Sequence, residues 1–207
     1  MTTNELFREV PATCVSDAMQ GLNNLDAAIK PLKEEYKIAG RACTVKMSAG
    51  DNMALLKGIR QAKPGDILVV DAKGYLYSAA AGDFVIGLAH TLGLGGVVID
   101  GTIRDVMSIK QLNFPVFCKG ATVACSKKYG VGEINVPISC GGVSVQPGDM
   151  IVGDVDGVVV VPQCKEEQVL TAALKKLKSD QTRAERILGN REAALQYIDN
   201  LLSEGCL

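Results

Sequence analysis

Histidine is almost absent from this chain of 207 residues, which contains a single one, His90. Histidine-based zinc sites, Cys–His dyads and Ser–His–Asp triads each need at least one well-placed imidazole. His90 lies within an apolar stretch that we expect to be helical, about two turns from its start, and this position indicates a packed core or interface residue. The chemistry available to the chain therefore rests on carboxylates, lysine, arginine or a hard metal ion.

The chain also lacks paired cysteines, since its seven cysteines include no C-x-x-C pair and their number is odd. A disulfide framework or a thiolate zinc site needs closer, paired spacing, so we interpret these residues as reduced thiols. The first ten residues, MTTNELFREV, have neither the basic nor the apolar region of an export signal. No uncharged run reaches the ~20 apolar residues that a membrane-spanning helix needs. We therefore expect a soluble, cytoplasmic protein with no membrane partner.

Net charge is close to zero, because 22 Lys and Arg against 23 Asp and Glu leave −1 at pH 7. This balance gives no electrostatic footprint for nucleic acid, and we expect no nucleic-acid partner. The basic residues near the C-terminus are mixed with acidic ones, which is typical of a solvated helix face. With 47% apolar and 22% charged residues, the composition is that of a globular protein, and we expect one domain over residues 1–207.

The pattern of apolar residues predicts a core over about 12–162 and C-terminal helices over 163–207. Helices and strands alternate first, and a mostly antiparallel, glycine-punctuated β section follows, so we expect an α/β fold with a layered, mixed sheet core. The last two helices, at roughly 163–188 and 191–203, carry spaced apolar residues that indicate packing on the body or on a neighbouring subunit. The predicted strands are 38–47, 67–71, 96–100, 115–118, 136–138, 143–145, 150–152 and 158–161, and the earlier predicted helices are 3–9, 12–21, 53–59, 83–94 and 106–112.

One apolar unit has charged residues and glycines at both of its ends. A predicted helix from Asp83 to about Leu94 rises ~16–18 Å, and the predicted strand 96–100 returns ~16 Å in the opposite direction. The start of the helix and the end of the strand should therefore lie level. Asp83 then faces the predicted loop 101–105, which carries Arg104 and Asp105.

Features that suit an anion converge at this end of the unit. The helix N-terminus leaves the backbone N–H groups around Phe84 and Val85 without intrahelical partners, which favours binding of a carboxylate. Gly82 allows the backbone to approach such a ligand closely. Arg104 adds a planar cation suited to a carboxylate or to a developing enolate oxygen.

The two aspartates add oxygen chemistry to the same end. Asp105 provides a hard oxygen ligand for Mg²⁺ or Mn²⁺, and Asp83 is placed to hold a water of that ion or to move a proton. Each aspartate also precedes an apolar helical stretch, where aspartate is a favoured N-cap, and Arg104 taken alone is an ordinary surface charge. Spacing alone therefore leaves a functional site and a pair of helix caps both open.

The string GDFVIGLAHTLGLGGVVIDGTIRDV, residues 82–106, resembles the signature of the RraA-like superfamily. Asp83, twenty intervening residues and the pair Arg104-Asp105 match the D-x20-R-D pattern of its 4-hydroxy-4-methyl-2-oxoglutarate / 4-carboxy-4-hydroxy-2-oxoadipate aldolase branch. The likeness extends over about residues 12–170 in the family's order. Supporting stretches are Gly50-Asp51-Asn52 and residues 64–71, 132–137 and 147–162.

This resemblance implies a swivelling β/β/α-type fold and a class II, metal-dependent pyruvate aldolase that assembles as a homotrimer or a hexamer. It implies cleavage of 4-hydroxy-2-oxo acids, such as 4-hydroxy-4-methyl-2-oxoglutarate, to pyruvate and a second carbonyl product. Breaking that bond leaves a pyruvate enolate, whose charge a metal ion and an arginine can stabilise. The same stabilisation would serve decarboxylation of oxaloacetate.

Roles for individual residues follow from the resemblance by position. Asp105 would bind the divalent metal, Mg²⁺ or Mn²⁺, and Asp83 and Arg104 would be catalytic, Asp83 acting through a water on the metal. Some family members take a further acidic residue from a neighbour's C-terminal region, for which Glu204 and the helix over 185–199 are candidates. The residues that would hold the 2-oxo acid substrate are Gly82, Asp83, Phe84, Val85 and Arg104.

Three alternatives remain beside this interpretation. The superfamily also includes regulators that bind and inhibit the endoribonuclease RNase E, and these need not keep the metal carboxylate. Lys119, at the end of a predicted strand, could act as the nucleophile of a Schiff-base aldolase, although a lysine beside a glycine is usually a solvated strand end. The fragment Asp154-x-Asp156-Gly157 resembles part of a calcium loop but lacks the remaining ligands, so we expect a β-turn there.

Overall fold

The computed structural model describes residues 2–204, and its centre is a mixed sheet of eight strands. Seven strands follow the order β1-β5-β4-β3-β2-β9-β10, and β6 pairs with β2 beside this row. Strands β2 to β5 are parallel to one another, whereas β1, β6, β9 and β10 are antiparallel to their neighbours. The strands of this sheet are β1 (Lys30–Pro31), β2 (Ile38–Met47), β3 (Ile67–Tyr75), β4 (Gly96–Ile103), β5 (Val116–Ala121), β6 (Gly132–Ile134), β9 (Met150–Asp154) and β10 (Gly157–Val161).

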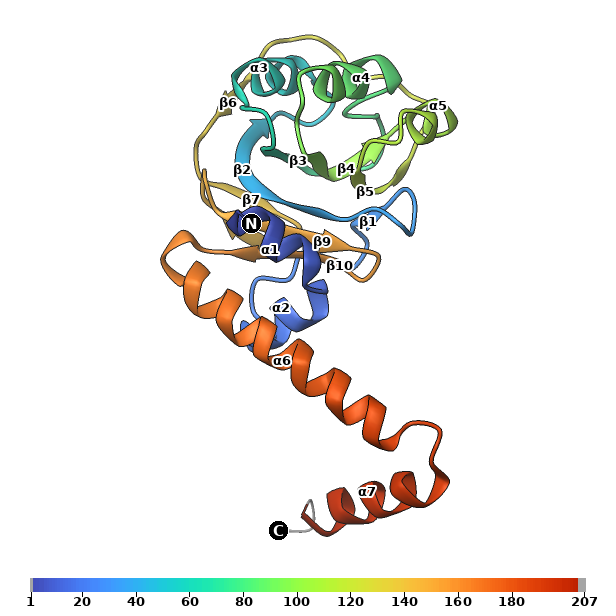
Figure 1. Ribbon diagram of the computed structural model, residues 1–207. Helices are drawn as coiled ribbons and strands as arrows, with labels where there is room; N and C mark the ends of the chain where they lie inside the picture. Colours follow the sequence, from blue (N-terminus) through green and yellow to red (C-terminus); the bar gives the residue numbers. More distant parts are fainter. Residues whose placement is uncertain (1, 205–207) are drawn as a thin grey trace.

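Strand β2 connects the two parts of the sheet. Its residues 38–41 pair antiparallel with β9, and residues 42–46 pair parallel with β3. The strand curves between these two parts (Figure 1), so the antiparallel strands form a second β layer below the parallel ones. A separate hairpin of β7 (Ile138–Cys140) and β8 (Val143–Val145) belongs to this β side of the molecule and contacts β3.

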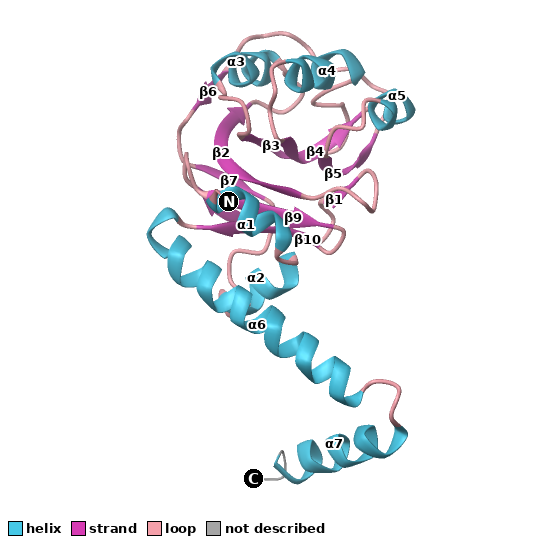
Figure 2. Ribbon diagram, in the orientation of Figure 1, coloured by secondary structure: helices cyan, strands magenta, loops and turns pink. Residues whose placement is uncertain are grey.

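The helices lie in two groups on opposite sides of the β layers (Figure 2). One group covers the parallel strands and consists of α3 (Met53–Gln61), α4 (Asp83–Thr91) and α5 (Val106–Gln111). Each of these helices connects two parallel strands, so each begins at the end of the sheet where the strands finish. The other group lies against β9 and β10 and consists of α1 (Thr3–Glu9), α2 (Ala12–Ala18) and, after the short 3-10 turn η1 (Gln163–Lys165), the start of α6 (Glu166–Ile187).

Three apolar clusters hold these layers together. The first lies between the parallel strands and α3–α5 and includes Leu55, Ile86 and Ile99. The second lies between the β layers and includes Phe117, and the third joins α1, α2 and α6 to β9 and β10 and includes Phe7. The residues at the centre of each cluster are fully buried, so each layer contributes hydrophobic stabilisation.

The structure confirms the predicted α/β class with a mixed sheet core and C-terminal helices. Several boundaries differ from prediction. The expected strand 136–138 is wrong, because Pro137 separates β6 from β7, and β3 continues four residues beyond the predicted end at Asp71. Among residues 2–204, none of the helices combines the length and apolar character that crossing a bilayer requires.

The C-terminal helices extend away from the body (Figure 1). The first half of α6 packs on α2, with Val169 and Ala173 buried, as predicted for packing on the body. The second half of α6 leaves the body and turns into α7 (Arg191–Glu204). Between Arg191 and Ser203, α7 buries no side chain.

Candidate active site

Gly82 lies directly against Arg104 and Asp105, twenty-odd residues later in the chain. The segment before Gly82 runs beside the end of β4: the Ala80 N–H donates to the Thr102 carbonyl at 2.8 Å, and the Arg104 N–H donates to the Ala81 carbonyl at 3.0 Å. A Cβ atom placed on Gly82 would lie 2.5 Å from Asp105 Oδ2 and 3.2 Å from Arg104 Nε. A larger residue here would require the Asp105 and Arg104 side chains to move, so glycine permits this close approach.

Arg104 and Asp105 form an ion pair that is open to solvent. Arg104 Nε lies 3.2 Å from Asp105 Oδ2, and the side chains are 43% and 37% exposed. Asp105 occupies the N-cap position of α5 with a left-handed backbone (φ 57°), yet its carboxylate makes no capping hydrogen bond. Asp105 therefore has the cap position that the sequence allowed, but its side chain does not cap the helix, and its oxygens retain capacity for a ligand.

Asp83 is the first residue of α4 rather than its N-cap, which is Gly82. Its Oδ1 accepts the N–H of Phe84 at 2.7 Å. Within the described residues the carboxylate makes no hydrogen bond or ion pair with Arg104 or Asp105. The fold thus brings Gly82, Arg104 and Asp105 into contact and places Asp83 beside them, with one of its oxygens bonded to its own helix.

The anion cradle predicted at the start of α4 is partly occupied by the chain itself. The Phe84 N–H is taken by Asp83, and the Ile86 N–H donates to the Gly82 carbonyl at 3.1 Å. The Val85 N–H has no hydrogen-bond partner among residues 2–204 and remains available, as expected in the first turn of a helix. The side chain of Phe84 points outward, with 76% of its surface exposed.

The expected loop 101–105 is mostly wrong, because residues 101–103 continue β4. The register shifts on both sides of this strand, between Ile99 and Thr102 against β5 and between Val70 and Tyr75 against β3. Irregularities of this kind bend a strand and redirect its side chains, and they often occur beside functional sites. Here the strand ends one residue before Arg104 and delivers the Arg104–Asp105 pair to the rim of the sheet.

The donor set fits a hard divalent cation. Across residues 2–204 there is no group of three or more His, Cys, Asp or Glu side chains placed to hold a metal ion. Zinc sites need such a group, whereas Mg²⁺ is held by one or two carboxylates together with water and substrate oxygens. The carboxylate of Asp105 is exposed and makes no capping hydrogen bond, so it suits a magnesium site of this kind.

Lys119 lies on the opposite face of the sheet and is held by two carboxylates. Its Nζ lies 2.7 Å from Asp100 Oδ1 and 2.9 Å from Asp26 Oδ2, and the side chain is only 17% exposed. Burial alone would lower the pKa of Lys119, but the hydrogen bonds and charges of Asp100 and Asp26 outweigh it and raise the pKa above its ordinary value. An ammonium group held in this way cannot attack a carbonyl, so the geometry argues against a Schiff-base mechanism.

Two other predicted features have clear positions. His90 is exposed on α4 and stacks on Phe114 with ring centroids 5.4 Å apart. A core position is therefore wrong, and an interface position stays a prediction. Asp154 and Gly157 close the β9–β10 hairpin, and Asp154 Oδ1 accepts the Asp156 N–H at 3.0 Å. This hairpin turn confirms the expectation of a β-turn rather than a calcium loop.

Four exposed apolar side chains lie on segments that adjoin the Arg104–Asp105 pair, and no pattern in the sequence predicted their exposure. They occur on segments attached to the end of β4: the Thr102 hydroxyl donates to the Ser78 carbonyl at 3.2 Å, and the Thr122 N–H donates to the Ile103 carbonyl at 2.9 Å. We refer to these four side chains as the apolar collar. Its members are Tyr77 (81% exposed), Phe84 (76%), Met107 (71%) and Val123 (95%).

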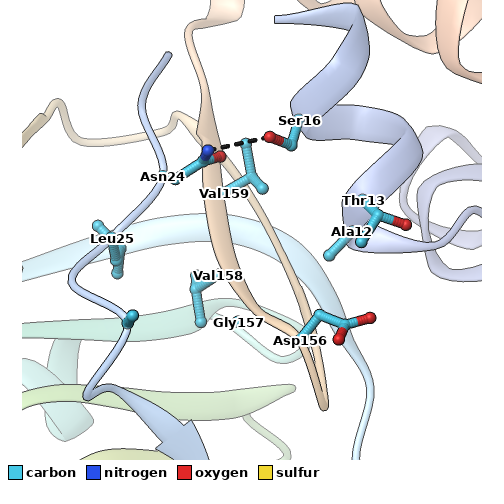
Figure 3. Close-up of a pocket in the computed structure, with 10 residues that line it drawn as sticks. Ala12, Thr13, Ser16, Asn24, Leu25, Asp156, Gly157, Val158 and Val159 are labelled. Carbon is cyan, nitrogen blue, oxygen red and sulfur yellow. Dashed lines mark hydrogen bonds between the residues drawn. The ribbon is translucent and has the colours of Figure 1, made fainter. Parts of the chain in front are cut away.

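A separate pocket lies between α2 and the β9–β10 hairpin (Figure 3). Asn24 and Ser16 point toward each other at one end of its lining, where the Asn24 amide donates to the Ser16 hydroxyl at 2.9 Å. The only charged side chain in its lining is Asp156. Its lining has no basic side chain to bind the carboxylate of a 2-oxo acid, and none of the predicted site residues lines it.

The chain is similar to known proteins over most of its length. Residues 12–160 match the RraA-like family, described as Aldolase/RraA. The chain is 53% identical over 196 residues to a Halalkalibacterium halodurans protein that is provisionally named 4-hydroxy-4-methyl-2-oxoglutarate aldolase, and the match covers 95% of this chain and 93% of the relative.

Two solved structures match different shares of this chain. The RNA-processing inhibitor RraA from Thermus thermophilus is 30% identical with a TM-score of 0.68, and the match covers 74% of this chain and 93% of that one. Streptomyces coelicolor RraAS2, described as an unusual member of the RNase ES inhibitor RraA protein family, is 27% identical with a TM-score of 0.79. That match covers 89% of this chain and 96% of RraAS2.

Proposed function

This chain belongs to the RraA-like family, Aldolase/RraA, and from that premise we propose that it is a divalent-metal-dependent carbon–carbon lyase. Its substrates would be 4-hydroxy-2-oxo acids such as 4-hydroxy-4-methyl-2-oxoglutarate, cleaved to pyruvate and a second carbonyl compound. The observation that carries the proposal is the contact of Gly82 with the exposed Arg104–Asp105 pair. The cytoplasmic location expected from the cysteine spacing belongs to the same proposal.

Arg104 binds the negatively charged end of the substrate. Its guanidinium makes one contact with Asp105 through Nε, which leaves its terminal N–H groups for a carboxylate or an enolate oxygen. The free Val85 N–H at the start of α4 provides a further donor, and the N-terminus of α4 favours an anion there. Gly82 leaves open the space beside Arg104 and Asp105, because a Cβ atom at this position would contact both side chains.

The reaction breaks the bond between C3 and C4 of the substrate. The C4 hydroxyl loses its proton and becomes the carbonyl of the released product, and the electron pair of the broken bond moves into the C2 carbonyl to give the pyruvate enolate. A proton added at C3 then completes pyruvate. Asp105 would hold Mg²⁺ or Mn²⁺, which when bound supplies Lewis acidity toward the 2-oxo acid oxygens. The Oδ2 atom of Asp83, whose Oδ1 is already bonded, is the group we assign to proton movement.

The same residues would support decarboxylation of oxaloacetate, which also passes through the pyruvate enolate. Arg104 stabilises that charge regardless of which bond has broken. We therefore propose oxaloacetate decarboxylase as a side activity of the site.

The site would be completed by a second copy of the chain. The apolar collar exposes four large side chains on segments that adjoin the Arg104–Asp105 pair, and large exposed apolar side chains near one site are typical of an interface. A homotrimer closed over the collar is the assembly that we propose. The acidic residue expected from a neighbour's C-terminal region has no assigned donor: the 185–199 segment spans the end of α6 and the start of α7, and the side chain of Glu204 lies outside the described residues.

A coupled assay for pyruvate tests the proposal directly. The wild-type protein should release pyruvate from 4-hydroxy-4-methyl-2-oxoglutarate and from oxaloacetate, lose this activity in EDTA and regain it with Mg²⁺ or Mn²⁺. Full activity in EDTA would contradict metal dependence. Borohydride trapping of pyruvate on the protein would instead indicate a lysine mechanism.

A second function is favoured by the similarity to two proteins named as inhibitors of RNA processing. In that case the protein would bind an endoribonuclease of the RNase E type and inhibit it. Binding that is unaffected by Arg104→Ala, in the absence of pyruvate release from any 4-hydroxy-2-oxo acid, would support the regulator over the lyase.

A further inference from the structure

A hollow lies at the edge of the sheet where the parallel strands begin. Gly65, Gly95 and Pro115 come one or two residues before β3, β4 and β5, and all three line it. The Arg104–Asp105 pair follows the other end of β4, and the eight residues of this strand separate the two edges by about 26 Å. The hollow has a volume of about 690 Å³, within the usual range for small-molecule sites. It is therefore separate from the candidate active site and large enough for a ligand of its own.

Aromatic side chains are concentrated in this hollow. The whole chain has four Phe, five Tyr, no Trp and one His, which makes ten rings. Three of them line the hollow: Tyr36, His90 and Phe114. The His90 ring is stacked on Phe114 with centroids 5.4 Å apart and an interplanar angle of 30°. Phe114 is buried and His90 is exposed, so the exposed surface of the imidazole can accept a further planar ring.

Tyr36 contributes a polar atom that the folded chain leaves without a partner. Its side chain is 4% exposed, and its hydroxyl makes no hydrogen bond among residues 2–204. Burial of an unpaired hydroxyl is unfavourable, and native proteins rarely keep one without a reason. Because Tyr36 lines the hollow, a ligand bound there can supply the missing acceptor.

The charges on the rim of the hollow favour an anion. Arg8 and Lys37 line it, and neither has an ion-pair partner within residues 2–204. Glu9 and Glu35 also line it, but Glu35 Oε1 already lies 3.8 Å from Lys33 Nζ. The unpaired side chains on the rim therefore leave an excess of one positive charge, which suits a ligand with a single negative charge.

Asn113 adds a neutral donor beside these charges. It lines the hollow, and its Oδ1 accepts a hydrogen bond from Lys33 Nζ at 3.1 Å. An ammonium group can only donate, so this bond identifies the oxygen of the amide and leaves the NH₂ group of Asn113 for a ligand. This NH₂ group makes no hydrogen bond with the part of the chain that the structure describes.

We propose that this hollow binds a planar aromatic carboxylate, a ligand that the proposed lyase reaction does not require. The aromatic ring stacks on His90, and the carboxylate accepts hydrogen bonds from Arg8 and Lys37. The Tyr36 hydroxyl and the Asn113 amide donate to the remaining oxygen lone pairs of the same carboxylate. Benzoate, the simplest ligand of this class, is the probe.

The single histidine makes the hollow directly observable. Since His90 is the only histidine of the chain, its imidazole resonances report this site without overlap from any other. In the full-length protein with isotope-labelled histidine, benzoate at constant pH should shift these resonances in a saturable way, with a Kd on the order of 1 mM for a ligand of this size. Absence of a saturable shift would overturn the proposal, and would fit a hollow that a second copy of the chain covers.

Two analogues of the probe separate the ring from the charge. Cyclohexanecarboxylate keeps the charge but has no planar ring, and benzamide keeps the ring but has no charge. Each should bind about fivefold or more weakly than benzoate. A Kd for cyclohexanecarboxylate equal to that of benzoate would overturn the aromatic part of the proposal, and an equal Kd for benzamide would overturn the anionic part.

Tyr36→Phe tests the buried hydroxyl. The substitution keeps the ring and removes only the unpaired oxygen, so the protein should fold with at least wild-type stability while benzoate binds about three- to tenfold more weakly. The matched control is Tyr197→Phe, the same change on α7, which should bind benzoate as the wild type does. An unchanged Kd in Tyr36→Phe would contradict the assigned role of the hydroxyl.

Arg8→Gln/Lys37→Gln tests the cations of the rim and should weaken benzoate binding by about tenfold or more. The control Lys175→Gln/Arg186→Gln removes the same charge from exposed positions of α6 and should leave the Kd unchanged. Equal Kd values for the two double variants would overturn the proposal. Asp105→Ala should bind benzoate with the wild-type Kd whatever its effect on pyruvate release, so failure of this proposal and failure of the lyase proposal are distinguishable.

Discussion

Two charged clusters lie near the end of β4, one on each face of the sheet, and they differ in how much of their bonding capacity is used. Lys119 and Asp100 are 17% and 10% exposed, and Arg104 and Asp105 are 43% and 37% exposed. Lys119 contacts two carboxylates, and the second oxygen of Asp100 accepts the Gly141 N–H at 2.9 Å. On the other face, Arg104 and Asp105 make one contact with each other.

The comparison shows that residue type does not separate a structural ion pair from a candidate catalytic one. Both clusters combine a cation with aspartate on neighbouring segments. The buried cluster fixes loop 24–29 and the β7–β8 turn to the sheet and has little capacity left for a ligand. The exposed pair leaves guanidinium donors and carboxylate oxygens unused. We expect the first to contribute to stability and the second to activity.

The largest effect is expected for Asp105→Ala. Pyruvate release should fall by a factor on the order of 10³ or more, about 4 kcal/mol of transition-state stabilisation, because the only carboxylate proposed to hold the metal is removed. The free energy of unfolding should change by less than about 1 kcal/mol, since this carboxylate makes no cap bond. Enzyme kinetics and thermal unfolding of the same sample check both parts. Wild-type kcat in this variant would reverse the assignment.

Asp100→Ala should produce the opposite pattern. Removing one partner of a buried ion pair leaves Lys119 poorly compensated, and the free energy of unfolding should fall by about 3 kcal/mol. Denaturant titration measures this loss. The molecules that remain folded should keep wild-type kcat, and a large loss of kcat without a stability change would mean that the two clusters are not separable. Asp26→Ala is a milder control, because Asp26 is 44% exposed.

Gly82→Ala tests the close approach at the exposed pair. The added Cβ would lie 2.5 Å from Asp105 Oδ2, so the pair must move, and we expect pyruvate release to fall by about 10- to 100-fold. Stability should change little, because φ of Gly82 is −119°, which any residue adopts. Gly65→Ala, at a turn with no atom within 4 Å of the added Cβ, is a control for backbone strain alone (φ 85°). Undiminished activity in Gly82→Ala would show that the space beside the pair is not used.

Asp51 gives the smallest expected effect and extends the comparison to a buried carboxylate with no cation. Its Oδ2 accepts the N–H groups of Gly130 and Val131 at 2.7 and 3.0 Å. Burial opposes its ionisation, but the hydrogen bonds from Met53, Val131 and Gly130 outweigh burial and lower the pKa below its ordinary value. Asp51→Asn should cost about 1–2 kcal/mol at neutral pH.

The sign of the pH dependence follows from that lowered pKa. The stabilisation by Asp51 is complete above the pKa of the unfolded state and is lost as pH falls through the lower pKa of the folded state. Denaturant titrations of the wild type and Asp51→Asn should therefore converge as the solution is acidified. A difference between them that stays constant with pH would show that ionisation of Asp51 contributes nothing.

Much of the fold followed from local patterns in the sequence. The helices that begin at Asp83 and Val106 and the strands that begin at Ile67 and Gly96 were predicted from apolar periodicity and turn residues. The element lengths also placed Asp83, Arg104 and Asp105 at one end of the unit, and the structure brings Gly82 into contact with Arg104 and Asp105. These features depend on residues near one another in the chain, which the sequence displays directly.

Other features depend on contacts between distant segments. No local pattern indicated that Lys119 would be held by Asp100 and Asp26, which lie 19 and 93 residues away, or that β4 would continue through Ile103. The apolar neighbours of His90 indicated a core or interface position, but only the packing of α4 decides which face of the helix is covered, and His90 lies on an exposed face.

The sequence by itself therefore determined which residues could perform chemistry. The single histidine argued against imidazole-based sites, and the spacing of Asp83, Arg104 and Asp105 placed them at one end of a βα unit. Tertiary structure decided which of the charged residues are saturated by partners and which remain open. It also showed that the carboxylate of Asp105 makes no capping hydrogen bond and that α7 buries no side chain between Arg191 and Ser203. The physical reason is that burial and hydrogen-bond partners are set by segments that meet only in the folded chain.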